Sequence, residues 1–307
     1  MGDICLLTVL VLCVLLGLMI SNWLLLILIM EATLFLFIFF SFSSFSLSGG
    51  ASAIKYYFSQ SLGSILFFVV SSYVLMFESS ENWILWVSLL MGVSLKLGAF
   101  PMHFWVLPVV GGLPYLVIWV LGCPMKVLPL YISYSLHVEL SQSWLTLLFL
   151  IIGLSSMGVG LFLGISAFSM RCVLGASSIS HTGWFLLALA SFDLFFYFFL
   201  YALMLLTVCL SLESTQRTLP AIALLGMGGL PPFSVFTGKL LVICSCIQNN
   251  MPLVFIVGAL LTSALSLLYY LKFAYWYYLS TSTKVGLPLV VVILLVLTSL
   301  TPLLLFS

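Results

Sequence analysis

The chain has 307 residues, of which 64% are hydrophobic and only 5% are charged, and its mean hydropathy is +1.38. A soluble protein devotes about a quarter of its residues to Asp, Glu, Lys and Arg, so this composition excludes a soluble domain and indicates an integral membrane protein. The 8 Lys and Arg residues are nearly balanced by 7 Asp and Glu residues, which excludes a basic nucleic-acid binder.

The first apolar segment, residues 4–20, resembles the apolar region of a signal peptide only in its length. The charge that precedes it is Asp3, where a signal or transit peptide carries Lys or Arg, and no small-residue cleavage site follows. We therefore expect this segment to be the first transmembrane helix.

Eleven apolar segments are long enough to cross a hydrocarbon layer of about 30 Å, for which about 20 helical residues suffice. They cover residues 4–20, 23–42, 57–76, 82–110, 114–136, 143–164, 172–191, 194–212, 219–247, 252–276 and 286–305. The connections are short, so we expect an all-α polytopic membrane protein that forms a single integral membrane domain over residues 1–307.

Eleven crossings place alternate connections on opposite sides of the bilayer, and the charges then separate by side. The side that holds the N-terminus receives Lys55, Arg171, Arg217, Lys272 and Lys284 against Asp3 and Glu213, whereas the other side receives Glu78, Glu81, Glu139 and Asp193. The positive-inside rule predicts that the N-terminus faces the compartment in which the chain is made. Aromatic residues gather near both faces, Trp83 and Trp86 at one and residues 275–278 (YWYY) at the other, as is typical of anchors in the lipid interface.

Four charged residues lie inside apolar segments: Glu31, Lys96, Lys126 and Lys239. Each ionisable residue at a helix centre costs about 2.5 to 3.5 kcal/mol, so four cost roughly 10 to 14 kcal/mol before they pair. One ion pair that joins two helices would explain one Glu and one Lys, but two further lysines remain with no acidic residue at membrane depth. The pattern favours a buried proton-relay line, because a lysine can become neutral when buried and an arginine cannot.

The histidines offer further relay steps. His103 and His181 lie near helix breaks or starts, and a relay role and a structural role are both open for them. We expect His137, beside Glu139, to lie in a solvated loop. In the proton-relay hypothesis, Glu31 modulates the proton affinity of Lys96.

The fourth and ninth segments, 82–110 and 219–247, are too long for one straight crossing, and both contain helix breakers. Gly98 and Pro101 follow Lys96, and residues 228–232 (GGLPP) precede Lys239. Interrupted helices at membrane depth are typical of a pathway or cavity. Because the two segments are five apart, we expect two inverted five-helix repeats, approximately residues 1–138 and 139–280, followed by a final helix over 286–305.

The seven cysteines form no pair or cluster with the spacing of a metal or iron–sulfur site. They stand at positions 5, 13, 123, 172, 209, 244 and 246. We expect neither a metal nor a cofactor in this chain, and no dinucleotide-binding motif follows a strand pattern.

Several motifs occur in an order that is specific to one known family. They are Met30-Glu31, residues 53–60 (AIKYYFSQ), residues 96–105 (KLGAFPMHFW) followed by Lys126, residues 177–184 (SSISHTGW) and residues 228–239 (GGLPPFSVFTGK). Together they resemble the subunit 2 family of mitochondrial NADH dehydrogenase (complex I), one of the antiporter-like membrane subunits. The chain departs from the family pattern at Leu107-Pro108 and at Val235.

The resemblance implies that Glu31, Lys96, Lys126 and Lys239 form the family's hydrophilic axis, with Glu31 and Lys96 as its ion pair. It implies proton translocation in the mitochondrial inner membrane, with the N-terminus on the matrix side and other membrane-arm subunits as partners. It also implies that NADH, FMN, the iron–sulfur clusters and ubiquinone bind in other parts of the complex.

Two other functions stay open at this point. One is a cation/proton antiporter subunit, which would share this helix pattern. The other is a structural membrane subunit, whose buried charges only hold helices together.

Overall fold

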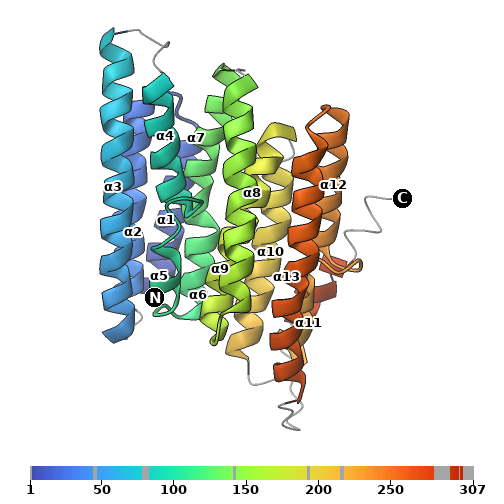
Figure 1. Ribbon diagram of the computed structural model, residues 1–307. Helices are drawn as coiled ribbons and strands as arrows, with labels where there is room; N and C mark the ends of the chain where they lie inside the picture. The colour runs from blue at the N-terminus through green and yellow to red at the C-terminus, as the bar shows by residue number, and fades with distance from the viewer. Residues whose placement is uncertain are drawn as a thin grey trace. The chain divides into compact units, whose positions relative to one another are not determined.

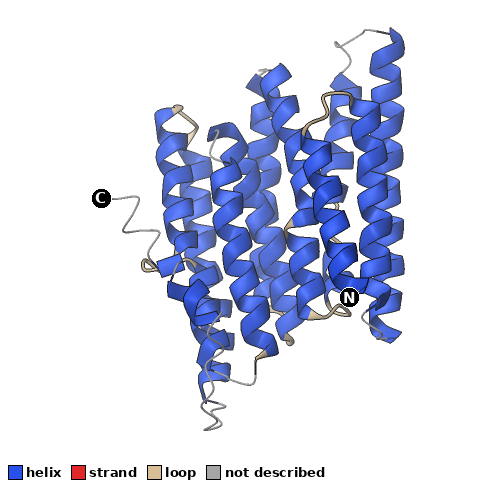
Figure 2. Cartoon of the chain, turned by 180° about the vertical axis from the view of Figure 1, so that it is seen from behind, coloured by secondary structure: helices blue, strands red, loops and turns tan. Residues whose placement is uncertain are grey.

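A computed structural model describes residues 2–43, 47–77, 83–140, 143–191, 194–214, 218–279, 291–296 and 298–299. These residues form helices and connections with no strand among them (Figure 2). Seven stretches are long and apolar enough to cross a membrane: Trp23–Phe42, Gly49–Tyr73, Tyr115–Val138, Trp144–Ile165, Met170–Leu189, Leu194–Glu213 and Leu253–Leu279. The protein is therefore helical and polytopic, and the count of eleven crossings stays a prediction.

The chain divides into two compact units, Met1–Leu140 and Ser141–Ser307. The inverted relation between two five-helix repeats, and a single membrane domain over residues 1–307, stay predictions. Most of the expected final helix, 286–305, lies outside the described residues, but 291–296 within it are helical.

The first unit contains seven helices in the part of it that the structure describes (Figure 1). They are α1 (Gly2–Leu18), α2 (Trp23–Ser43), α3 (Leu47–Phe77), α4 (Trp83–Leu97), α5 (Val106–Val110), α6 (Tyr115–Gly122) and α7 (Pro124–Leu140). Helix α2 packs between α1 and α3, and α4 packs against α3 and α7. Because α2 and α4 both pack on α3, the middle of α2 and the end of α4 lie close together.

The expected fourth segment is interrupted after Lys96, as its breakers predict. Gly98 has a φ of +70°, and a Cβ there would lie 2.5 Å from Val106 Cγ2, so only glycine fits this turn. The interruption leaves carbonyl groups at the end of α4 without their usual helical partners, and the indole Nε1 of Trp105 donates to Leu95 O at 2.8 Å. The chain then returns to helix at α5.

The structure corrects the expected fifth segment, 114–136, which is interrupted as well. Helix α6 ends at Gly122 and α7 begins at Pro124, with Cys123 between them at φ −118° and ψ −81°. Proline has no N–H to continue the hydrogen-bond ladder, so the helix restarts there. Lys126 consequently lies in the first turn of α7.

Two boundaries in this unit also differ from expectation. Helix α3 begins at Leu47, ten residues before the expected start, because the small residues 48–53 continue the helix and Ser52 Oγ donates to Gly49 O. Lys55 is therefore an exposed residue of α3 rather than part of a connection. Helix α7 extends to Leu140, so His137 is a buried helical residue and the solvated loop expected around it is wrong.

The second unit contains six helices in the described part of the chain up to Leu279, besides the helical residues 291–296. They are α8 (Ser143–Ile165), α9 (Met170–Ser191), α10 (Leu194–Glu213), α11 (Thr218–Gly228), α12 (Ser234–Gln248) and α13 (Leu253–Leu279). Helix α8 packs along α9, and α13 packs against both α8 and α11 (Figure 1). Helix α12 contacts α9 and α10.

The expected ninth segment is interrupted between α11 and α12. Gly229 follows the end of α11 at a φ of +85°, which favours glycine, and Pro231 and Pro232 cannot continue the ladder. A tight turn follows, in which Phe233 N donates to Leu230 O at 3.0 Å. The turn brings the end of α11 to the beginning of α12, where Lys239 lies.

The charges that support the orientation are only partly described. Arg171 lies in the first turn of α9, Lys272 is exposed on α13 and Glu213 ends α10. Five others lie outside the described residues: Glu78, Glu81, Asp193, Arg217 and Lys284. The orientation of the N-terminus therefore stays a prediction.

Candidate functional site

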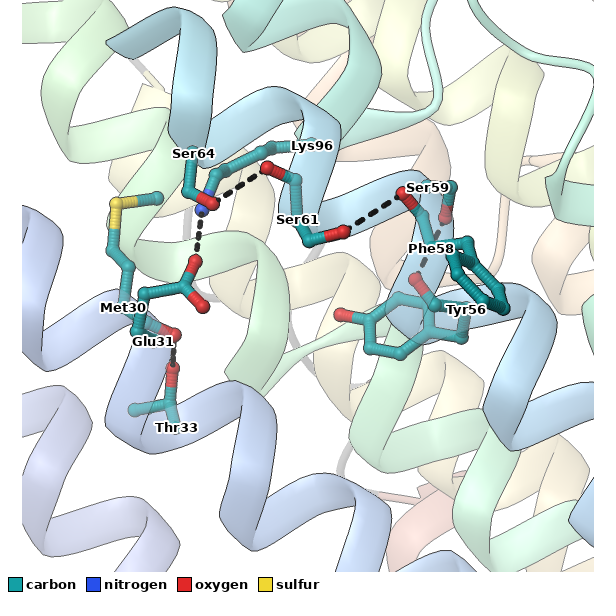
Figure 3. Close-up of polar contacts among 9 residues, drawn as sticks. All are labelled: Met30, Glu31, Thr33, Tyr56, Phe58, Ser59, Ser61, Ser64 and Lys96. Carbon is teal, nitrogen blue, oxygen red and sulfur yellow. Dashed lines mark hydrogen bonds and ion pairs between the residues drawn. The ribbon is translucent and has the colours of Figure 1, made fainter. Parts of the chain in front are cut away.

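Glu31 and Lys96 meet inside the first unit. Glu31 lies in the middle of α2 and Lys96 in the last turn of α4, and Lys96 Nζ is 3.7 Å from Glu31 Oε1 (Figure 3). The side chain of Lys96 is 3% exposed and that of Glu31 is 28% exposed. A charge-assisted hydrogen bond is about 2.7 to 2.9 Å long, so the two groups attract each other without a tight bond.

The position of Lys96 suits a positive charge. The carboxyl end of a helix carries a partial negative charge, and Lys96 is the residue before the last one of α4. Its aliphatic stem packs on α3 at Gly63, where a Cβ would lie 3.0 Å from Lys96 Cγ. The small residue therefore lets α3 and α4 approach closely around the lysine stem.

Hydroxyl groups near the pair are satisfied within their own helices. Ser61 Oγ donates to Phe58 O and Ser64 Oγ donates to Ser61 O, along α3 (Figure 3). On α2, Thr33 Oγ1 donates to Met30 O at 2.8 Å. In contrast, Glu31 Oε1 accepts no hydrogen bond within the described residues, so Lys96 is its main electrostatic partner there.

Lys126 is fully enclosed in the first unit. Its backbone N donates to Cys123 O at 3.0 Å, which closes the first turn of α7 after the interruption. The residue is buried, and α7 packs against α4. A lysine in this place stands next to a helix interruption, as Lys96 does.

Lys239, in the second unit, is also buried beside a helix interruption. Its Nζ donates to Gly228 O, the last carbonyl of α11, at 3.3 Å, and lies 5.5 Å from the ring centre of Trp184. A helix carboxyl end and an aromatic face both attract a cation. Together these groups can hold a charged lysine in the interior.

A small cavity adjoins Lys239. Its lining residues are Met157, Ser180, His181, Trp184, Lys239, Thr262, Ser263, Ser266 and Tyr270. The space for the centre of a water molecule is about 10 Å³, close to the minimum of about 10 to 15 Å³ that one water needs. A polar cavity of this size beside a lysine can hold a single water molecule.

The two candidate histidines have different surroundings. His181 is buried in α9, its Nδ1 is 2.8 Å from the hydroxyl of Tyr197, and it lines the cavity of Lys239. His103 lies in the turn between α4 and α5, where its ring contacts Phe104 at 4.3 Å between centres. The structure thus brings His181 and Lys239 to one cavity, whereas His103 belongs to the interruption after Lys96.

Sequence reasoning missed the tyrosines around Lys239. Tyr197 on α10 pairs with His181, and Tyr270 on α13 lines the cavity. Tyr270 stands five residues before a run of aromatic residues at the end of its segment. In the sequence it therefore looks like another aromatic anchor in the lipid interface rather than a residue of the site. Within the described residues, no group of three or more His, Cys, Asp or Glu side chains could hold a metal ion.

Comparison with known proteins places this chain in a family. A family model described as NADH:quinone oxidoreductase/Mrp antiporter, transmembrane, matches residues 7–266. The NADH-ubiquinone oxidoreductase chain 2 of Albinaria caerulea is 31% identical over 260 residues, which cover 85% of this chain and 84% of that protein. The protein of the same name from Mus musculus is 28% identical over 249 residues, covering 73% and 71%.

Solved structures share the fold. A chain of respiratory complex I from Thermus thermophilus matches with a TM-score of 0.81 at 22% identity, covering 96% of this chain and 77% of that one. A chain of the Mrp complex from Dietzia matches with a TM-score of 0.72 at 19% identity, covering 86% and 59%. Since the family model spans most of the chain, this protein belongs to the NADH:quinone oxidoreductase/Mrp antiporter transmembrane family.

Proposed function

We propose that this chain is a membrane-arm subunit of respiratory complex I, the NADH:ubiquinone oxidoreductase, and that it takes part in proton translocation. The relatives named NADH-ubiquinone oxidoreductase chain 2 support this assignment. The observation that carries the mechanism is the placement of Lys96, Lys126 and Lys239, each buried beside a helix interruption.

The proposed mechanism uses Glu31, Lys96, Lys126 and Lys239 as an axis of groups that bind and release protons. Glu31 favours the charged form of Lys96 while the two are close, and the loose contact of 3.7 Å lets that attraction change when the carboxylate moves. His181 is a further relay candidate at Lys239, and His103 is one at the turn after Lys96. The driving event is quinone reduction elsewhere in the complex, which changes the electrostatics along the axis.

The proposed surroundings follow from this role. The chain spans the mitochondrial inner membrane with its N-terminus on the matrix side, among lipid and the other membrane-arm subunits. NADH, FMN, the iron–sulfur clusters and ubiquinone bind in other parts of the complex, and the redox chemistry takes place there. This chain contributes the path of the proton.

Substitution of Lys126 by Met tests the mechanism in the assembled complex. Met keeps an unbranched, apolar side chain in the buried site but cannot carry a proton, so we expect assembly to persist and fewer protons to be pumped per electron. The measurement is the proton-to-electron ratio of purified complex in proteoliposomes. The matched control is Lys55→Met, because Lys55 is exposed on α3 and should leave the ratio unchanged. A wild-type ratio in the Lys126 variant would refute the role of this lysine.

A second candidate is a cation/proton antiporter subunit, which the likeness to the Dietzia Mrp complex favours. Such a protein would exchange sodium for protons without NADH. Sodium-dependent proton movement in membranes that lack NADH oxidation would support it over the complex I assignment.

A further inference from the structure

We propose that the hydroxyl groups of Tyr269 and Tyr270, on α13, relay protons between the cavity of Lys239 and the end of the second unit at which α13 ends. This inference rests on the proposed proton translocation and adds a route by which protons reach or leave Lys239. All the groups that form the route belong to the second unit.

At its inner end, the route begins at the cavity of Lys239. Tyr270 lines this cavity together with Ser180 and Ser266. Tyr270 also packs on the carbonyl-bearing end of α11, since a Cβ on Gly228 would lie 3.4 Å from Tyr270 Cδ2. Gly228 O is the acceptor for Lys239 Nζ, so the tyrosine and the lysine flank the same residue.

The middle of the route is the tyrosine pair itself. The two rings lie 4.4 Å apart between centres, and each residue is only 1% exposed. Neither hydroxyl oxygen makes a hydrogen bond of good geometry within the described residues. Other hydroxyls lie beside them, namely those of Ser180 and Ser266 near Tyr269 and that of Ser177 near Tyr270.

Such a cluster is unusual for a purely structural role. Burial of a hydroxyl costs free energy unless other polar groups compensate for the lost water, and phenylalanine would fill the same volume without that cost. Two adjacent buried tyrosines, surrounded by serines from α9 and α13, therefore indicate that the hydroxyls themselves are needed. Small shifts of side chains or one added water would connect them.

At its outer end, the route approaches a groove on the surface of the second unit. The ring of Tyr269 packs on Gly164, in the last turn of α8, where a Cβ would lie 2.7 Å from it. Ala167 and Phe273, respectively three residues after Gly164 and four after Tyr269, line a groove of about 600 Å³ that also contains Lys272. Along α13, Phe273 in the groove wall lies about one helical turn, roughly 5.4 Å, beyond Tyr269.

A hydroxyl can relay a proton without becoming charged. It accepts a proton on one lone pair while it donates its own proton to the next acceptor, so one proton enters and one leaves. The O–H bond formed on one side replaces the O–H bond broken on the other, and the phenol then rotates back. Tyr269, Tyr270 and a water in the cavity would in this way exchange a proton with the amine of Lys239.

The test replaces Tyr269 and Tyr270 by Phe, singly and together, in the assembled complex. Phe removes only the oxygen, so we expect normal assembly and NADH:quinone activity. Transfer at this step should slow by about 10²-fold, the low end for a positioned proton-transfer group. The readouts are the proton-to-electron ratio and the solvent deuterium isotope effect on pumping, which a structural role would leave unchanged.

Two controls make the result specific. Tyr278→Phe removes a hydroxyl from the same helix at a site that is 61% exposed and does not line the groove, and it should behave as wild type. Lys239→Met tests the proposed function itself. If Lys239→Met lowers the ratio while the double Phe variant keeps wild-type ratio and isotope effect, the relay is wrong and the lysine axis stands. If Lys239→Met also leaves the ratio unchanged, the proposed function fails.

A variant that does not assemble would be replaced by Ser180→Ala. Ser180 belongs to α9, lines the cavity of Lys239 and lies near the hydroxyl of Tyr269. A lower ratio with a larger isotope effect in this variant would support the relay, and wild-type values would overturn it.

Discussion

The surroundings of the contact between Glu31 and Lys96 determine which of the two positions suits the positive charge. Lys96 lies at the carboxyl end of α4, where the helix attracts a cation, whereas Glu31 lies in the middle of α2. Exchanging the two charges would keep the attraction between α2 and α4 but would place a carboxylate at the negative end of a helix. The penalty for that placement is about 0.3 to 1 kcal/mol.

We expect the double variant Glu31→Lys/Lys96→Glu to assemble better than either single variant. Each single change places two like charges side by side, whereas the exchange restores opposite charges. Proton pumping should nevertheless stay impaired in the double variant, because a carboxylate at position 96 does not hold a proton as a lysine does. Native gel electrophoresis measures assembly, and the proton-to-electron ratio measures pumping.

This pair of measurements separates transport from a structural role. If the charges only held α2 and α4 together, the exchange would restore both assembly and pumping. Restored pumping in the double variant would therefore favour the structural membrane subunit over the proton axis.

At the scale of elements, the interruption after α4 depends on Gly98. An alanine there would carry a Cβ at a φ of +70° and 2.5 Å from Val106 Cγ2. A left-handed conformation costs a residue with a side chain roughly 1 to 3 kcal/mol, and the clash adds to it. We expect Gly98→Ala to lower the melting temperature of the isolated complex and the amount of complex assembled.

Gly158→Ala, on α8, is the matched control for that substitution. A Cβ on Gly158 would meet nothing within 4 Å, and alanine favours a helix by roughly 0.5 to 1 kcal/mol over glycine. Equal losses of stability in the two variants would contradict the special role of the turn at Gly98.

Local chemistry made part of the fold predictable. Gly98 and Pro101 after Lys96, and residues 228–232 before Lys239, predict interruptions that the structure contains at 98–105 and 229–233. The interruption at Cys123 was missed because a single proline within a long apolar run is also compatible with a continuous or kinked helix. The start of α3 was missed because small residues such as those in 48–53 are as common in connections as in membrane helices.

The candidate site was predictable where an ionisable residue, a lysine or a histidine, marked it. Lys96, Lys126 and Lys239 stand out because a charge is costly at membrane depth. Tyr197, Tyr269 and Tyr270 carry no such signal, since their burial depends on which helices pack around them. For His137 the nearby charge was misleading. Glu139 led us to expect a solvated loop, whereas the packing of α7 buries the histidine.

At the scale of the molecule, the exposed surface indicates that the chain works within an assembly. The side chain of Glu31 is 28% exposed in the isolated chain, although it lies at the centre of a membrane helix. Contact of a carboxylate with lipid at that depth costs about 2.5 to 3.5 kcal/mol. Apolar residues of α2 and α3, such as Leu28, three residues before Glu31, and Leu62, are exposed as well. We therefore expect another membrane subunit to cover this face.

Isolation of the native assembly tests this expectation together with the proposed function. A photoactivated crosslinker at Leu28 or Leu62 should capture a second membrane protein, and mass spectrometry of the gently solubilised complex should find flavoprotein and iron–sulfur subunits with NADH:quinone activity. Capture of lipid alone at both positions would contradict a covering subunit. Recovery of only membrane subunits, without NADH oxidation, would make the cation/proton antiporter the better assignment.

Because the energy for pumping comes from quinone reduction in the complex I assignment, proton movement should also stop when a quinone-site inhibitor blocks electron transfer. In the antiporter assignment it should continue under a sodium gradient.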